Sequence, residues 1–230
     1  MRILRIITTF VFGLSLFVIP VQAKEGLSLG FTLGSHTLDQ GAKEDVDSNG
    51  TTDATHSRSD SFTVPGLTAG YTKDLAGMFS LTVGAEYIPV KAGLKTAINK
   101  DTDTLAAAAT INVAVTNRVS ATLADHISLF VQPTVNISDT TSVFGTIGYS
   151  EASVDVVAST QTSTSFTKGL TLEGVRYGLG VRHYVSDGMF IQLEGYQAEY
   201  DTISATTSDS TKVSVDADDT VGAVTIGATF

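Results

Sequence analysis

The feature that most constrains this chain is the alternation of apolar with small or polar residues along many of its segments. In "FSLTVGAEY" (79–87) the apolar residues all fall on odd positions: Phe79, Leu81, Val83, Ala85 and Tyr87. "LSLGFTL" (27–33) and "LTAGY" (67–71) repeat the pattern. Because successive side chains of a β-strand point to opposite faces, a period of two predicts strands with one apolar and one polar face. The chain is therefore expected to be all-β.

Two kinds of break separate the alternating segments. The short ones are rich in turn-forming residues: "DLAG" (74–77), "SDTT" (138–141) and "SDGM" (186–189). The long ones are rich in Ser, Thr, Asp and Gly: residues 39–61, 95–110, 158–170 and 202–217. Short turns alternating with long loops are typical of an outer-membrane β-barrel. A soluble β-sandwich is the alternative, but its loops would not sort in this way.

The number of strands depends on residues 111–137, which contain a polar break at "ADH" (124–126). The odd apolar positions keep their phase across this break, which predicts one continuous strand, whereas a reversal would give an odd total. We therefore predict an eight-stranded antiparallel up-and-down transmembrane β-barrel. Its strands are expected at 26–38, 62–74, 78–94, 111–137, 142–157, 171–186, 189–201 and 218–230. Several should project beyond the outer surface, because about 9–11 residues suffice to cross the membrane.

Residues 1–23 are expected to be a signal peptide, and residues 24–230 the barrel with four long extracellular loops. Arg2 and Arg5 precede an apolar run that ends in small residues before Ala23. This pattern predicts export through the periplasm, cleavage after Ala23 and location in the cell outer membrane.

Composition excludes several classes of function. The net charge of −10 argues against nucleic-acid binding, which needs a basic face. Because the chain has no cysteine, it has neither a disulfide nor a thiol nucleophile. The histidines lie apart from one another in the sequence, so they suggest no metal cluster or catalytic triad.

Aromatic residues of the apolar phase are expected to form girdles at the two membrane surfaces. The outer girdle is predicted to contain Tyr87, Tyr149 and Tyr177, each about ten residues from its nearest short turn. The inner girdle is predicted to contain Tyr71, Phe79 and Phe230.

The opposite phase places charged residues inside a barrel whose lumen is just wide enough for side chains to fill. Arg182 and Glu194 are expected at similar heights on neighbouring strands, and Arg176 and Glu86 at matching distances above their turns. We predict a buried network in which each of these charges meets an opposite partner and which plugs the barrel. A gated path for ions through the same groups is the alternative.

His126 and Ser128 form an H-x-S pair like that of an outer-membrane lipid A deacylase. The residues around the pair do not match that enzyme, and both side chains are expected to point into the lumen, whereas a lipase site must face the bilayer. We therefore assign no catalytic residue and expect no enzymatic activity.

The segment "DVDSNGTTD" (45–53) has the spacing of a calcium loop. Its candidate ligands are Asp45, Asp47, Asn49, the Thr51 carbonyl and Asp53. His56 stands where a bidentate Glu is required, so any calcium site should be weak, and a simple polar turn is the favoured interpretation. No other cofactor is expected.

The last strand, "VGAVTIGATF" (221–230), resembles the C-terminal strand of the small bacterial outer-membrane β-barrels, the group of the OmpA transmembrane domain, OmpX and the opacity proteins. Residues 169–201 are similar to the penultimate hairpin of that group. The resemblance implies recognition of Phe230 by the barrel-assembly machinery. We also expect contact with outer-membrane lipid and lipopolysaccharide, and a monomeric barrel. From the filled lumen and the long loops we expect a non-enzymatic role in envelope structure or loop-mediated surface interaction, with a narrow porin as the alternative and a lipid-modifying enzyme as the third hypothesis.

Overall fold

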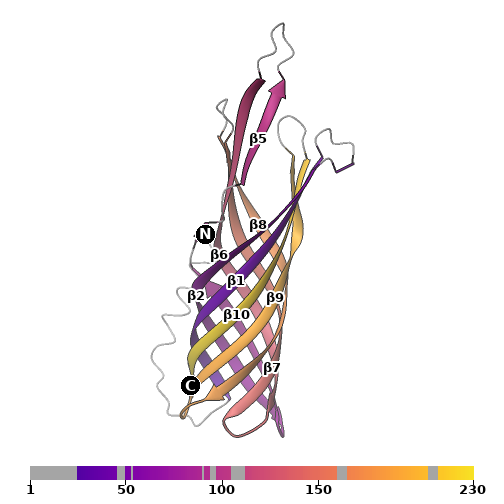
Figure 1. Ribbon diagram of the computed structural model, residues 1–230. Coiled ribbons are helices and arrows are strands. Elements are labelled where there is room, and N and C mark those ends of the chain that lie inside the picture. Colours follow the sequence, from indigo (N-terminus) through magenta and orange to yellow (C-terminus); the bar gives the residue numbers. More distant parts are fainter. Residues whose placement is uncertain are drawn as a thin grey trace.

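Figure 1 shows the computed structural model, a closed antiparallel barrel whose strands extend beyond the closed part at one end. The structure describes residues 25–45, 50–52, 54–89, 91–93, 97–104, 112–159, 165–206 and 212–230. Within these ranges, no helix has the length and apolar character needed to cross a membrane. The strands are β1 (Gly26–Asp45), β2 (Ala54–Ala76), β3 (Phe79–Ile88), β4 (Ala92–Gly93), β5 (Ala97–Thr104), β6 (Asn112–Asn136), β7 (Thr141–Ser159), β8 (Ser165–Tyr184), β9 (Met189–Thr206) and β10 (Lys212–Thr229).

The barrel closes on itself through two pairings. The first strand, β1, pairs with the last, β10, and β3 pairs with β6. Because β3, β4 and β5 follow one another along β6, they share one position in the wall, and the barrel has eight strands in cross-section. This arrangement confirms the predicted all-β, eight-stranded antiparallel barrel.

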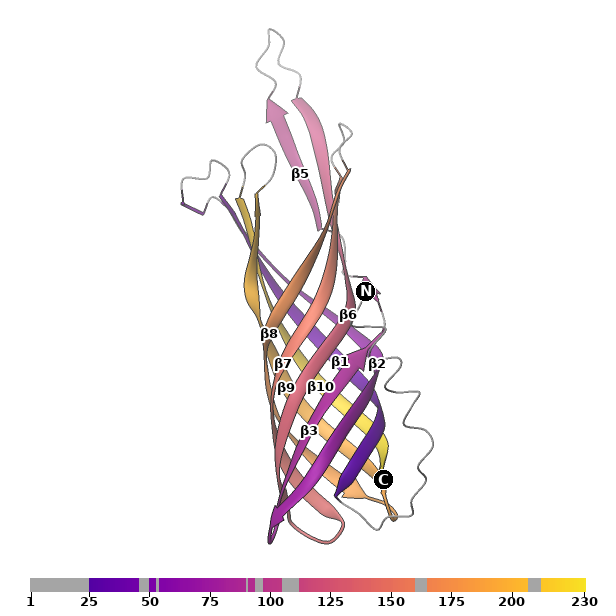
Figure 2. The ribbon, with the colours of Figure 1, turned by 180° about the vertical axis from the view of Figure 1, so that it is seen from behind.

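The two ends of the barrel differ. At one end, here called the short-turn end, residues 77–78, 137–140 and 185–188 connect neighbouring strands. Gly77 and Gly188 adopt φ values of 59° and 82° there, a region that glycine enters without steric cost. At the opposite end, here called the extended end, the strands run far beyond the closed barrel and β5 with β6 reaches furthest (Figures 1 and 2).

The strands are longer at the extended end than the sequence predicts. Residues expected to form long loops continue as paired strands, so that β1 stays in register with β2 up to Glu44 and Ala54. Likewise, β7 and β8 remain paired up to Ser159 and Ser165. The hydrophobic alternation disappears in these stretches because their outward face is polar, but the backbone ladder continues without it. The predicted boundaries of β1, β2, β8, β9 and β10 were therefore wrong at this end, whereas those of β6 and β7 agree within two residues.

The strand β6 is continuous, as predicted, but the face on which its odd-numbered side chains lie changes along its length. Pairing with β7 shifts by one residue between Ala124 and Ile127, and Asp125 has a φ of 49°. This β-bulge inserts one extra residue, which moves the odd positions from one face to the other. Leu129 is consequently exposed on the outer wall, whereas Leu123 packs inside. The predicted absence of a phase change at 124–126 was wrong.

The outer wall is apolar over the part of the barrel nearer the short-turn end. On β1, Phe31 and Leu33 are 55% and 50% exposed, while Thr32 between them is 3% exposed. The same arrangement occurs on β9, where Ile191 and Leu193 are exposed and Gln192 is buried. An apolar exterior around a polar interior is the reverse of a soluble β-barrel and matches a barrel surrounded by lipid.

Candidate functional site

Buried polar side chains from five strands fill the lumen nearer the short-turn end. Each of them is at most 9% exposed: Glu86, Gln132, Arg176, Arg182, Gln192 and Glu194. They occupy the inward positions of β3, β6, β8 and β9, with Thr146 of β7 beside them. Buried charges are costly unless oppositely charged or hydrogen-bonding groups meet them, so the partners of each charge decide the stability of this network.

Arg176 forms ion pairs with two carboxylates. Its Nη1 contacts Glu86 Oε2, and its Nη2 donates to Glu194 Oε1 at 3.1 Å. The guanidinium carbon lies 3.6 Å from the ring centroid of Tyr196 and 5.5 Å from that of Phe130. Two aromatic faces and two carboxylates thus surround one cation, an arrangement that combines charge pairing with cation–π attraction.

The partners of Arg182 differ from the prediction, because this arginine hydrogen-bonds to side-chain amides and not to a carboxylate. Its Nε and Nη2 donate to Gln192 Oε1 at 2.9 and 2.7 Å, and Nη2 also donates to Gln132 Oε1 at 3.2 Å. The prediction that each charge meets an opposite partner does not hold for Arg182, because the β8–β9 register places Gln192 opposite Arg182. Gln192 Nε2 in turn donates to Glu194 Oε2 at 3.2 Å, so the amide relays the contact between the two charges.

Inward-facing glycines make room for the aromatic rings that hold the arginines. A Cβ atom added at Gly180 would lie 2.2 Å from Cζ of Phe144, whose ring centroid is 5.7 Å from the Arg182 guanidinium. A Cβ added at Gly227 would lie 2.4 Å from Cζ of Phe190, on the other side of Arg182. Each ring therefore occupies space that a glycine leaves free on the neighbouring strand and that a larger residue would obstruct.

The network leaves almost no free volume. The cavity lined by these side chains offers about 20 Å³ to the centre of a water molecule, room for about one water. Side chains therefore fill the lumen at this level.

A second polar layer lies between this network and the extended end. His36 Nδ1 is 2.7 Å from Asp219 Oδ2, and its ring stacks on Phe62 with centroids 5.2 Å apart. Across the lumen, the Tyr200 hydroxyl is 3.1 Å from His126 Nε2. The His36–Asp219 pair joins the first strand to the last, at the seam where the barrel closes.

His126 and Ser128 point into the barrel and are 6% and 0% exposed. Ser128 Oγ lies 2.7 Å from Ser150 Oγ, while His126 contacts Tyr200. Neither side chain faces the outer wall, so this pair has no access to a lipid ester in the bilayer.

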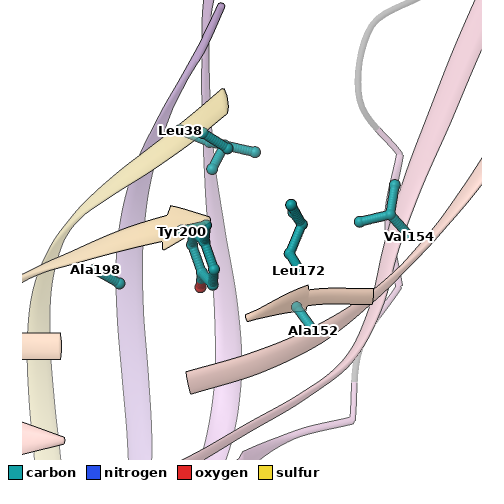
Figure 3. Close-up of a cluster of buried hydrophobic side chains, with 7 residues drawn as sticks. Leu38, Ala152, Val154, Leu172, Ala198 and Tyr200 are labelled. Atoms are coloured by element: carbon teal, nitrogen blue, oxygen red, sulfur yellow. The ribbon is translucent and has the colours of Figure 1, made fainter. Parts of the chain in front are cut away.

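A cluster of buried apolar side chains lies inside the barrel, between the polar layer and the extended end. Figure 3 shows its side chains, which come from different strands, with Tyr200 between Ala198 and Leu172 in this view. The cluster consists of Leu38, Ala152, Val154, Leu172, Ala198, Tyr200 and Ala217, against which Phe62, Leu123 and Ile203 pack. The alternation in the sequence did not predict this cluster.

The three tyrosines predicted for the outer girdle face outward, and each donates a hydrogen bond to a carboxylate. Tyr149 donates to Glu173 at 2.7 Å, Tyr87 to Asp125 at 3.3 Å, and Tyr177 to Glu199. The inner set, Tyr71, Phe79 and Phe230, is exposed near the short-turn end.

Beyond the tyrosines the outer wall carries acidic residues. Asp39, Asp218 and Glu199 occupy adjacent outward positions on β1, β10 and β9. Partial burial, together with the negative charges of Glu199, Asp216 and Asp39, raises the pKa of Asp218. Crowded carboxylates thus make this part of the wall strongly negative.

The calcium hypothesis falls largely outside the described residues. Asp47, Asn49 and Asp53 lie outside them, as does the side chain of Asp45, while Thr51 is exposed. In the part of the chain that the structure describes, no three His, Cys, Asp or Glu side chains are grouped so as to hold a metal ion.

Comparison with known proteins identifies the fold. No family model matches the chain, and no curated protein matches its sequence. The structure is similar to the outer membrane protein OprG of Pseudomonas aeruginosa, with 13% identity, 91% of this chain and 99% of that chain covered, and a TM-score of 0.54. It is also similar to the outer membrane protease OmpT of Escherichia coli, with 8% identity, 89% and 97% coverage, and a TM-score of 0.51.

The chain therefore has the fold of the bacterial outer-membrane β-barrels. Its exposed apolar band is the surface that such a fold presents to lipid. Within this class it is an eight-stranded barrel whose lumen is occupied by its own side chains.

Proposed function

We propose that the protein is a non-enzymatic barrel of the outer membrane, closed to solutes, that holds its extended end at the cell surface for envelope structure or surface interaction. The observation that carries this proposal is the filled lumen, where Arg176, Glu86 and Glu194 pair across the barrel and leave room for about one water. A rigid closed cylinder suits the presentation of surface segments better than the passage of solutes.

The extended end supports the presentation role. Its strands remain paired beyond the apolar band, and the apolar cluster around Leu38 and Leu172 provides them with a core. On this proposal the connecting loops are carried on a stiff β-structure above the lipid. Outer-membrane lipid and lipopolysaccharide would surround the apolar band, and the assembly machinery would recognise the Phe230 end of a signal-cleaved, monomeric chain.

Electrical recording tests the closed lumen. The purified mature chain, reconstituted into planar lipid bilayers, is expected to give no steady single-channel current, because a filled lumen offers ions no hydrated path. An open porin reconstituted in the same way serves as the positive control. Steady ion-selective currents from the folded protein would instead support a narrow channel.

Solubility tests the membrane assignment separately. The folded chain is expected to need detergent or lipid, because large apolar side chains such as Phe31 and Leu179 cover the outer wall. A folded monomer in detergent-free buffer, detected by sedimentation, would contradict the assignment.

A further inference from the structure

The apolar residues change sides along several strands. On β1, Phe31 and Leu33 are exposed on the outer wall, whereas Leu38 is 2% exposed inside the lumen. On β9, Leu193 is exposed, whereas Ala198 and Tyr200 are buried inside. The polar network thus gives way to an apolar layer in the same lumen.

The residues of this apolar layer come from most of the barrel wall. Among the side chains that the structure describes, its members come from seven strands: Leu38 on β1, Phe62 on β2, Leu123 on β6, Val154 on β7, Leu172 on β8, Tyr200 on β9 and Ala217 on β10. Ala152 and Ala198, which are 0% and 1% exposed, complete the packing. None of these residues carries a charge, and one hydroxyl, that of Tyr200, contacts His126 below.

The layer is separate from the ionic network. Between the two lie the His36–Asp219 and His126–Tyr200 contacts, which come from β1, β10, β6 and β9. No hydrogen bond or ion pair found among the described residues joins Arg176 or Arg182 to a side chain of the layer. The layer should therefore persist when the charges below it are removed.

We propose that this apolar layer is a second barrier to water and ions, placed in series with the ionic network and independent of it. The proposal rests on the closed lumen of the proposed function. An apolar constriction of this kind excludes water because a wetted apolar surface gains no hydrogen bonds, and a dry constriction excludes ions. Opening the ionic network alone would leave the barrel closed.

Two sets of substitutions, recorded in planar bilayers, separate the barriers. The network variant replaces Glu86, Arg176, Arg182 and Glu194 with serine, which keeps the formal charge balanced and leaves a polar, hydrated lumen. The layer variant carries Leu38→Ser and Leu172→Ser. Each variant alone is expected to give no steady current, whereas the combined variant is expected to conduct. Leu38→Met with Leu172→Met in the network background is the matched control and should stay closed.

Each result has one meaning. Steady current from the network variant, or from its methionine control, would overturn the independent apolar barrier while leaving the closed wild-type lumen intact. A combined variant that is folded by gel mobility and circular dichroism but remains closed would also overturn it. Current from the wild-type barrel would instead contradict the proposed function.

A thiol measurement covers the case in which the combined variant does not fold. Because the chain has no cysteine, Ser128→Cys introduces a single thiol at the level of the network. Silver ions added at the extended end should react with it at least about tenfold faster after Leu38→Ser than with the layer intact or with Leu38→Met. Equal rates in all three would overturn the proposal.

Discussion

Replacing Arg176 with methionine is expected to lower the free energy of unfolding by about 3–5 kcal/mol. The change leaves the carboxylates of Glu86 and Glu194 buried without the cation that both contact. It also removes a guanidinium that lies 3.6 Å from the Tyr196 ring centroid. Urea titration in lipid vesicles, followed by far-ultraviolet circular dichroism, measures the loss.

Arg182→Met is the matched control, because this arginine is similarly buried but hydrogen-bonds to the amides of Gln192 and Gln132. Its removal leaves no carboxylate without a directly paired cation. The loss in free energy of unfolding should therefore be smaller than for Arg176→Met. Adding Glu86→Gln and Glu194→Gln to Arg176→Met should restore part of the stability. Equal losses from the two arginine variants would show that charge pairing does not dominate this network.

The second large effect is expected at Gly180. A methyl group there would meet Cζ of Phe144 at 2.2 Å and the Leu193 carbonyl oxygen at 2.6 Å, and the carbonyl belongs to the neighbouring backbone. Gly180→Ala should therefore lower the free energy of unfolding by about 1–3 kcal/mol, and larger residues should lower it further. The same urea titration measures this loss.

The chain offers a close control for this substitution. Gly195 lies on the adjacent strand β9 with nothing within 4 Å of an added Cβ, so Gly195→Ala should change stability by no more than about 0.5 kcal/mol. Combining Gly180→Ala with Phe144→Leu should relieve the clash and recover some of the loss. A neutral Gly180→Ala would mean that the Phe144 ring moves aside freely.

The sequence predicted the strands of the barrel and the faces of their side chains better than the contacts between side chains in the lumen. Alternation along segments such as 79–87 determines which face each side chain takes, and this is enough to place Arg176 and Glu86 inside. Partners inside the lumen depend also on register. The turn at 185–188 sets Arg182 opposite Gln192, and counting residues from the turn did not resolve this offset from Glu194.

The apolar layer had a detectable signal in the sequence. On the first strand, Leu33 and Leu38 have opposite parity, which means that apolar side chains leave the outer face and enter the lumen between them. This change is missed if every strand is assumed to have an apolar outer face along its full length. The bulge at Asp125 could not be found in the same way, because Leu123 and Leu129 keep the same parity and only the extra residue separates their faces.

The exchange of polarity between the two halves of the barrel has a consequence for biogenesis. A finished extended end, with Asp39 and Glu199 on its exterior, has no favourable route through hydrocarbon. On the proposed orientation, these stretches must reach the far side as open chain and pair only there. Maturation would then proceed in two stages. The apolar part of the barrel would insert into the membrane first, and the strands of the extended end would pair afterwards in water.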